Sequence, residues 1–102
     1  LITACVTILT MIGSFLCEDT EALSKGWCVR KFAGIAKVAR RKLRQLEIAG
    51  RLDDLKVPPG NRLEALKGDR AGQFSIRIND QWRLCFRWSQ GIAYDVEIVD
   101  YH

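Results

Sequence analysis

The chain has 102 residues and a formal net charge of +4; 48% of its residues are hydrophobic and 27% are charged. That length allows one domain with a modest core, and the composition excludes a disordered or fibrous chain. The four cysteines form no C-x-x-C motif and His102 is the single histidine, so the spacing of a zinc site is absent. We therefore expect no metal or other cofactor, and we interpret the cysteines as reduced thiols of a cytoplasmic protein.

Residues 1–17 carry no charge, a composition shared by signal peptides and membrane spans. The segment lacks a basic start and a small-x-small cleavage site, and it is short for a span, so we expect no membrane insertion. Its Thr, Val and Ile content favours a strand, and residues 11–15 are a natural opening for one. We expect residues 1–10 to be an upstream extension, from a tag or an early start, and residues 11–102 to form the domain.

Two helices are predicted next. Asp19 or Thr20 could cap a short helix that runs through Ser24 and ends at Gly26. A longer helix is predicted over residues 35–49, where apolar side chains recur at the spacing of one helix face. These apolar residues are Ile35, Ala39, Leu43 and Leu46.

The longer helix lies in a strongly basic part of the chain. Residues 25–51 contain nine Lys or Arg and one acid, so they carry +8, whereas the other 7 bases and 11 acids give −4. This asymmetry suggests a surface that faces a polyanion, although a solvated helix face is the ordinary alternative. The cations on the polar face of the helix are Lys37, Arg40, Arg41 and Arg44.

Four strands are predicted in the second half of the chain, over residues 62–66, 73–79, 82–88 and 92–99. Helices first and a meander of strands afterwards is typical of an α+β fold. We therefore predict that the N-terminal helices pack on one face of a small, mainly antiparallel sheet. In the last strand, alternation predicts one face made of Ile92, Tyr94, Val96 and Ile98.

The middle strands form a predicted hairpin around Asn79 and Asp80. A two-residue loop would pair Ile76 with Arg83 and place a charge among apolar neighbours. A three-residue loop, residues 79–81, or a bulge brings the apolar faces together instead, and we predict this register. It leaves one polar, exposed face with Ser75, Arg77, Arg83 and Arg87.

Residues capable of acid–base chemistry occur at three places that a meander could bring to this exposed face: Arg62, Glu64 and Lys67; Arg83; and residues 100–102. Such a set suits phosphodiester cleavage without a metal, because a base must deprotonate a 2′-hydroxyl, cations must neutralise the phosphorane, and an acid must protonate the 5′-oxygen. The alternative is structural: Glu64 and Lys67 form a surface ion pair, and Arg83 bridges a carboxylate of the last strand.

Residues 61–88 and 94–102 closely resemble the HigB toxins of the RelE/ParE superfamily, and the resemblance extends over residues 11–102. Its motifs are Leu-Lys-Gly-Asp-Arg at 66–70, Asn-Asp-Gln-Trp-Arg at 79–83 and Asp-Tyr-His at 100–102. The resemblance implies a RelE-like fold and a toxin of a type II toxin–antitoxin system, an endoribonuclease that cleaves mRNA in the ribosomal A site and inhibits translation. It also implies a helix-turn-helix, HigA-like antitoxin, with operator DNA bound only through the toxin–antitoxin complex.

The resemblance also implies roles for individual residues. The residues that the family ties to cleavage fall on Lys67, Arg83, Tyr101 and His102, and Glu64 stands where some members have histidine and others glutamate. We assign Glu64 as the base, Lys67 and Arg83 as phosphate stabilisers and His102 as the acid. Tyr101 would orient a base of the RNA or share in proton transfer. Ribosomal RNA or an acidic antitoxin surface would meet the basic helix, and the expected RNA contacts are Lys37, Arg40, Arg41, Arg44, Arg62 and Arg70.

Two other functions are compatible with the same fold. One is a non-catalytic module that binds RNA or a protein partner, and the other is a gyrase inhibitor like those of the ParE branch. The combination of Lys67, Arg83 and the Tyr101–His102 pair argues against both, because a pure binding module has no need of this acid–base set.

Overall fold

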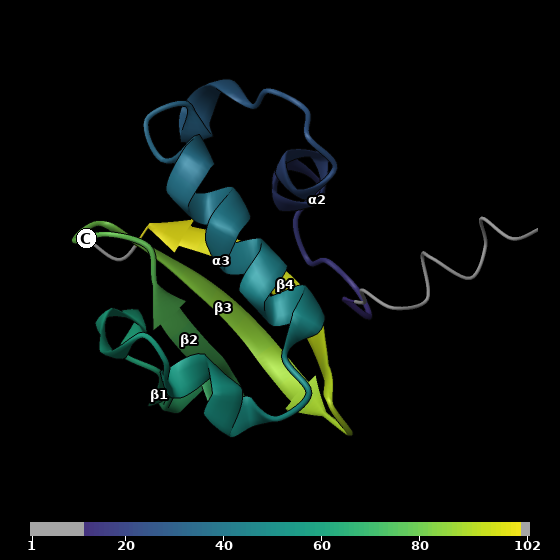
Figure 1. Cartoon of the computed structure of the whole chain (residues 1–102), viewed down its shortest axis with the longest axis vertical. Coiled ribbons are helices and arrows are strands. Elements are labelled where there is room, and N and C mark those ends of the chain that lie inside the picture. Colours follow the sequence, from purple (N-terminus) through teal and green to yellow (C-terminus); the bar gives the residue numbers. More distant parts are fainter. Residues whose placement is uncertain (1–11, 101–102) are drawn as a thin grey trace, which may run out of the picture.

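The structure, a computed structural model, describes residues 12–100. Within them, two α-helices and four short 3-10 turns accompany four strands (Figure 1). The helices are α2 (Glu18–Ser24) and α3 (Ala36–Ile48), and the strands are β1 (Glu64–Ala65), β2 (Phe74–Arg77), β3 (Trp82–Ser89) and β4 (Ile92–Asp100). The 3-10 turns are η1 (Arg30–Phe32), η2 (Leu52–Lys56), η3 (Pro59–Asn61) and η4 (Gly68–Arg70). The predicted α+β fold is confirmed.

The short helix α2 differs from the prediction at one end only. Its N-cap is Cys17 and no side chain caps it, so the prediction of Asp19 or Thr20 as the cap was wrong. Thr20 is buried, and its Oγ1 accepts a hydrogen bond from the Ile98 N–H at 3.0 Å, which ties the helix to β4. Gly26 follows the helix with φ of +94°, a conformation that favours glycine, as the predicted stop requires.

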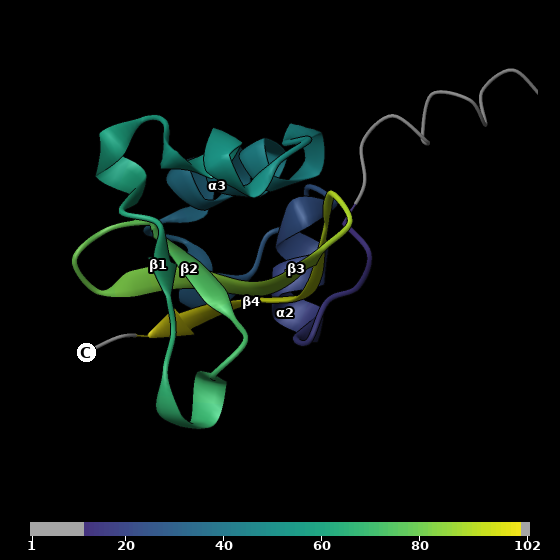
Figure 2. The same ribbon diagram turned by 90° about the horizontal axis from the view of Figure 1, so that it is seen from below.

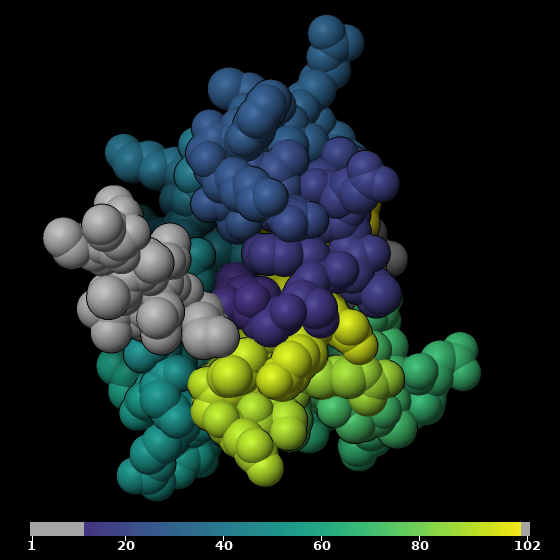
Figure 3. All heavy atoms as spheres, turned by 90° about the vertical axis from the view of Figure 1, so that its right-hand side faces the viewer, coloured from purple at the N-terminus to yellow at the C-terminus, as the bar shows by residue number. Residues whose placement is uncertain are grey.

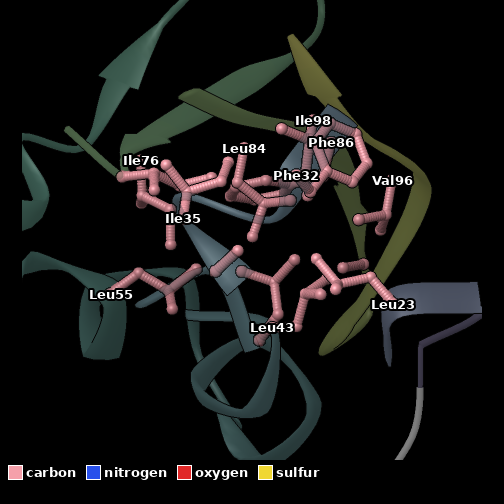
Figure 4. Close-up of a cluster of buried hydrophobic side chains, with 14 of the residues drawn as sticks. Leu23, Phe32, Ile35, Leu43, Leu55, Ile76, Leu84, Phe86, Val96 and Ile98 are labelled. Carbon is pink, nitrogen blue, oxygen red and sulfur yellow. The ribbon is translucent and has the colours of Figure 1, made fainter. Parts of the chain in front are cut away.

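The core lies between α3 and one face of the sheet. Ala39, Leu43 and Leu46 of α3 are buried, as the helical spacing predicted. Figure 4 shows the α3 side chain Leu43 facing the side chains of β2, β3 and β4. Burial of one such leucine contributes about 1.5–3 kcal/mol, so this layer is the main source of stability. The fully buried large side chains include Phe32, Phe86, Leu23, Leu43, Leu46, Leu55, Ile76, Leu84 and Val96.

The four strands form one antiparallel sheet in the order β1-β2-β3-β4. In the central hairpin Ile76 pairs with Leu84 and Arg77 with Arg83, and the Ile78 N–H donates to the Trp82 carbonyl at 2.9 Å. The loop therefore holds residues 79–81, and the predicted register is confirmed. The Asn79 Oδ1 accepts the N–H groups of Gln81 and Trp82 at 2.9 and 2.8 Å, which closes the turn.

A β-bulge changes the inner face of β4. The register shifts between Cys85 and Arg87 of β3, and Asp95 has φ of +52° on the facing strand. One extra residue on β4 reverses the alternation, so Ala93 is buried on the core side and Tyr94 is only half-buried. The prediction that Ile92 and Tyr94 share a face with Val96 and Ile98 was therefore wrong.

The opening segment lies along the outer side of β4. Phe15 forms a single parallel bridge with Val96, and Gly13 donates its N–H to the Ala93 carbonyl at 2.7 Å. The predicted first strand is thus one bridge with flanking hydrogen bonds, and Figure 3 shows this segment against β4. Met11 and the expected extension, residues 1–10, lie outside the described residues. From residue 12 to residue 100, no helix has the length and apolarity that crossing a membrane requires.

The close packing of Gly13 against the Tyr94 ring leads to a prediction about stability. A methyl group at this position would overlap the Tyr94 ring, so Gly13→Ala must displace the ring or the segment. We expect the free energy of unfolding to fall by about 1–3 kcal/mol, as for other overpacked sites. Urea unfolding followed by circular dichroism measures this. Gly34→Ala is the matched control, because a methyl group added there would meet nothing within 4 Å. Equal stability of the two variants would contradict the described packing.

Candidate active site

Arg83 is the most enclosed of the predicted site residues within the described part of the chain. It extends from β3 on the sheet face opposite α3, yet its relative exposure is only 9%, so the expectation of an exposed side chain was wrong. Its Nε donates a hydrogen bond to the Ser75 Oγ at 2.8 Å, and its Nη2 donates to the Arg62 carbonyl at 2.7 Å. The guanidinium is therefore held by β2 and by the turn that precedes β1.

Glu64 supplies a carboxylate beside this guanidinium. It pairs with Ser75 across β1 and β2, and its Oε1 lies 3.5 Å from the Arg83 Nη2. The Glu64 side chain is 54% exposed while that of Arg83 is 10% exposed, so a substrate can reach the carboxylate directly. Arg62, at φ of +48°, has the left-handed backbone conformation just before β1. The structure thus places the Arg83 guanidinium beside a carboxylate of β1.

Lys67 lies three residues after Glu64, at the start of η4, and it is exposed. Figure 2 shows α3 on one side of the sheet and the η4 connection extending on the other side. Over residues 12–100 no ion pair joins Lys67 to Glu64, so the surface ion pair considered from the sequence does not form. Lys67 is therefore a solvent-exposed cation at the start of the connection between β1 and β2.

Arg70 and Cys85 complete the polar face. The Arg70 Nη1 donates to the Glu97 Oε1 at 2.9 Å and to the Gln73 Oε1 at 3.0 Å, which holds Arg70 against β4, and its role as an RNA contact stays a prediction. Burial raises the pKa of the Cys85 thiol, and the nearby Arg70 only partly opposes this. A protonated thiol is a poor nucleophile, which supports the interpretation of Cys85 as structural.

Tyr101 and His102 lie outside the described residues. The last described residue, Asp100, pairs with Trp82, the neighbour of Arg83 on β3. The Asp100 Oδ2 accepts a hydrogen bond from the Gln81 Nε2 at 3.0 Å, which fixes the end of β4 against the hairpin loop. The described part of β4 therefore ends beside the strand that carries Arg83.

The basic residues of α3 divide into two groups. Lys37, Arg41 and Arg44 are exposed, and Arg44 forms a loose ion pair with Glu47 at 3.7 Å. Arg40 instead donates to two backbone carbonyls, those of Leu23 at 3.1 Å and Trp27 at 2.8 Å. Arg40 thus connects α3 to the end of α2, and its role as an RNA contact stays a prediction. Arg62, by contrast, is exposed as expected.

Lys42 was not predicted to have any role. It is buried on α3 and donates a hydrogen bond to the Asn61 Oδ1, and burial lowers the pKa of its ammonium group. Asn61 in turn donates to the Leu55 carbonyl at 3.0 Å, so the pair connects α3 to the turns that precede β1. The sequence carries no clear signal for this, because Lys42 lies among other cations.

Ser75 is the site residue whose importance sequence reasoning missed. The predicted register placed it on the polar face beside Arg83, but a serine in a strand carries no chemical signature of its own. Its hydrogen bond to Arg83 appears only when the register is combined with the side-chain geometry. Over the described residues, no three His, Cys, Asp or Glu side chains gather into a group that could hold a metal.

Comparison with known proteins identifies the family. Residues 29–102 match the family of HigB-like toxins, described as RelE-like toxins of the type II toxin–antitoxin system HigB. Toxin HigB-1 of Vibrio cholerae serotype O1 is 51% identical over 53 residues, which cover 52% of this chain and 56% of that protein. Endoribonuclease HigB of Proteus vulgaris is 44% identical over 41 residues, which cover 40% and 45% of the two chains.

The matched segments are shorter than the relatives themselves, and the chain spans about half the length of the curated relatives it matches. Most of the chain nevertheless lies inside the family match, including Glu64, Lys67 and Arg83. Residues 12–28 precede the matched range but belong to the same fold, since Leu23 of α2 lies in the common core. The chain therefore belongs to the HigB-like family of RelE-like toxins from type II toxin–antitoxin systems.

Proposed function

We propose that this toxin is an endoribonuclease that cleaves mRNA on the ribosome and thereby inhibits translation. The observation that carries the proposal is the contact between Glu64 and Arg83, a solvent-accessible carboxylate beside an immobilised guanidinium at 3.5 Å. A base next to a cation is what attack by a 2′-hydroxyl on a phosphodiester requires. The printed name of the Proteus vulgaris relative, an endoribonuclease, supports the same reaction.

Five residues share the steps of the proposed reaction. Glu64 takes the proton of the 2′-hydroxyl, whose oxygen then attacks the adjacent phosphorus. Lys67 and Arg83 neutralise the charge that develops on the phosphorane oxygens. The bond to the 5′-oxygen breaks, and His102 donates a proton to that oxygen, while Tyr101 orients the reacting nucleotide. The products are a 2′,3′-cyclic phosphate and a 5′-hydroxyl, and this proton transfer requires no metal ion or other cofactor.

The partners follow from the same proposal. The toxin acts in the cytoplasm, where ribosomes carry the translated mRNA, and it is held inactive by a HigA-like helix-turn-helix antitoxin. Operator DNA is bound through the antitoxin and not by the toxin alone. Because α3 and η4 lie on opposite sides of the sheet (Figure 2), the basic residues of α3 meet a different surface from the mRNA at the catalytic face.

The exposed cations of α3 lead to a prediction about ribosome binding. Lys37→Ala combined with Arg41→Ala should flatten the log–log dependence of ribosome affinity on salt by about one to two units, because each lost phosphate contact removes about 0.7–0.9 unit. Ribosome affinity measured by co-sedimentation over a series of salt concentrations tests this. Arg51→Ala with Lys56→Ala is the control with the same change in charge, because both cations are paired with Asp53 on η2. An unchanged slope in the α3 variant would assign this surface to the antitoxin instead.

The proposed activity is tested by mapping the ends of mRNA after brief expression of the toxin and in a purified translation system. We expect cuts within translated codons, 5′-hydroxyl ends, and loss of cutting when ribosomes are omitted. A non-catalytic binding module would block translation without producing new ends. A gyrase inhibitor would leave mRNA intact and instead cause DNA damage and altered supercoiling.

A further inference from the structure

Ser75 occupies a fully enclosed place on the polar face of the sheet. Its relative exposure is 0%, and it lies in a cross-strand row between Glu64 on β1 and Cys85 on β3. Its neighbour Ile76 is buried in the core on the other face, so the β2 backbone at Ser75 is fixed by packing. The Ser75 hydroxyl is thus a hydrogen-bonding group at a well-defined position.

The guanidinium of Arg83 is held through two of its nitrogen atoms. The Nε donates to the Ser75 Oγ at 2.8 Å, and the Nη2 donates to the Arg62 carbonyl at 2.7 Å. A guanidinium is planar and its donors have a fixed geometry, so bonds through two separate nitrogens define the orientation of the whole group. Ser75 and Arg62 therefore set the direction in which Arg83 presents its charge beside Glu64.

We propose that Ser75 is a positioning residue for Arg83 in the mRNA cleavage reaction, an inference that rests on the proposed function. Ser75 does not itself contact the RNA. It keeps the guanidinium aligned before the substrate arrives, so no reorganisation is needed when charge develops on the phosphorane. Preorganised donors of this kind are the largest single source of stabilisation in many active sites.

A purely structural role for Ser75 makes a different prediction. A buried hydroxyl with a purely structural role would affect the stability of the fold, and its loss would leave the single-turnover cleavage rate of the folded protein unchanged. A positioning role acts through the Arg83 Nε–H, so the effect of Ser75 on the cleavage rate should vanish when Arg83 is absent. A double-mutant cycle separates the two roles.

The cycle uses Ser75→Ala, Arg83→Ala and the double variant, with single-turnover cleavage of mRNA on programmed ribosomes at saturating toxin. Ser75→Ala should cut about tenfold more slowly, the effect expected when a charged group loses one hydrogen bond. Its ribosome affinity should stay at the wild-type value. The double variant should cut no more slowly than Arg83→Ala alone. Cys85→Ala is the matched control, because it removes one side-chain atom from the neighbouring buried position and should keep the wild-type rate.

A second readout is independent of activity. In 15N-labelled protein, the Arg83 Nε–H should exchange slowly with solvent in the wild type and in Cys85→Ala, and at least tenfold faster in Ser75→Ala. Should Ser75→Ala fail to fold, Ser75→Cys leaves no empty space at this position and offers a much weaker acceptor, and it should also cut several-fold more slowly.

The possible results separate this inference from the proposed function. Wild-type cleavage rates in Ser75→Ala or Ser75→Cys, or a tenfold loss that persists in the absence of Arg83, would overturn the positioning role while leaving the nuclease in place. A wild-type protein that cuts no RNA on or off the ribosome would overturn the proposed function and the positioning role together.

Discussion

Replacing His102 with glutamine is expected to slow the cleavage of translated mRNA by about a hundredfold to ten thousandfold, the range that general acid catalysis contributes. His102 is the single histidine in the chain, and an unperturbed imidazole has a pKa of about 6.5, so it can donate a proton near neutral pH. The leaving 5′-oxygen of RNA is a poor leaving group unless it is protonated. Single-turnover cleavage on programmed ribosomes, measured over a range of pH, tests this.

The pH dependence adds a specific signature. The wild-type rate should fall as the pH rises through the pKa of the imidazole, because the acid is then already deprotonated, and this decline should disappear in His102→Gln. Ribosome affinity should be nearly unchanged, because one side chain adds little to a contact with many phosphates. A wild-type rate in His102→Gln would show that His102 is not the acid, and that Tyr101 or Lys67 must take this role.

Arg83→Ala is expected to abolish growth arrest by lowering the cleavage rate by roughly a hundredfold or more, since it removes the guanidinium that the proposed mechanism uses to stabilise the transition state. Colony formation after induction and single-turnover cleavage measure the effect. The most informative control is Arg77→Ala, which removes a cation from the paired position on β2; Arg77 forms its ion pair with Asp80 of the loop and not with Glu64. Arg77→Ala should remain toxic. Full toxicity of Arg83→Ala would argue against catalysis at this face.

Arg83→Ala should also cost some stability. Because Arg83 is nearly buried, its removal leaves the Ser75 hydroxyl and the Arg62 carbonyl without this donor, at an expected cost of about 1–3 kcal/mol. Urea unfolding must therefore accompany the toxicity assay, so that loss of activity is not confused with loss of folded protein. From the strand pattern alone Arg83 would be placed in solvent, where its removal would have almost no effect on stability.

The sequence predicts those parts of the fold that depend on the alternation of apolar and polar residues in strands or on the spacing of apolar residues in helices. The register of the central hairpin follows from one requirement, that Ile76 must not pair with Arg83, and the structure pairs it with Leu84. The bulge in β4 could not be predicted, because it depends on Asp95 adopting φ of +52° and on packing against β3. The cap of α2 was missed for a similar reason, since Thr20 bonds to β4 and not to its own helix.

In the candidate site, too, some features could be predicted from the sequence and others could not. Glu64 and Arg83 could be named from their chemistry and from a family motif, and the structure brings them together. The distinction between Arg40, which holds backbone carbonyls of another element, and Arg41, which faces solvent, depends on how α2 is placed against α3. A pattern of charges along one helix contains no information about that placement. For Tyr101 and His102 the assigned roles stay predictions.

The opening segment beside β4 has a consequence for how the protein behaves toward other copies of itself. An uncovered β4 would offer the backbone groups of Ala93 and Val96 as a template for strand addition, the route by which sheets aggregate. Hydrogen bonds from residues 13–16 already occupy those groups. At the opposite margin β1 is only two residues long, too short to recruit another strand effectively. Residues 93–96 of β4 and the short β1 therefore offer little unpaired backbone for edge-to-edge association with another copy of the chain.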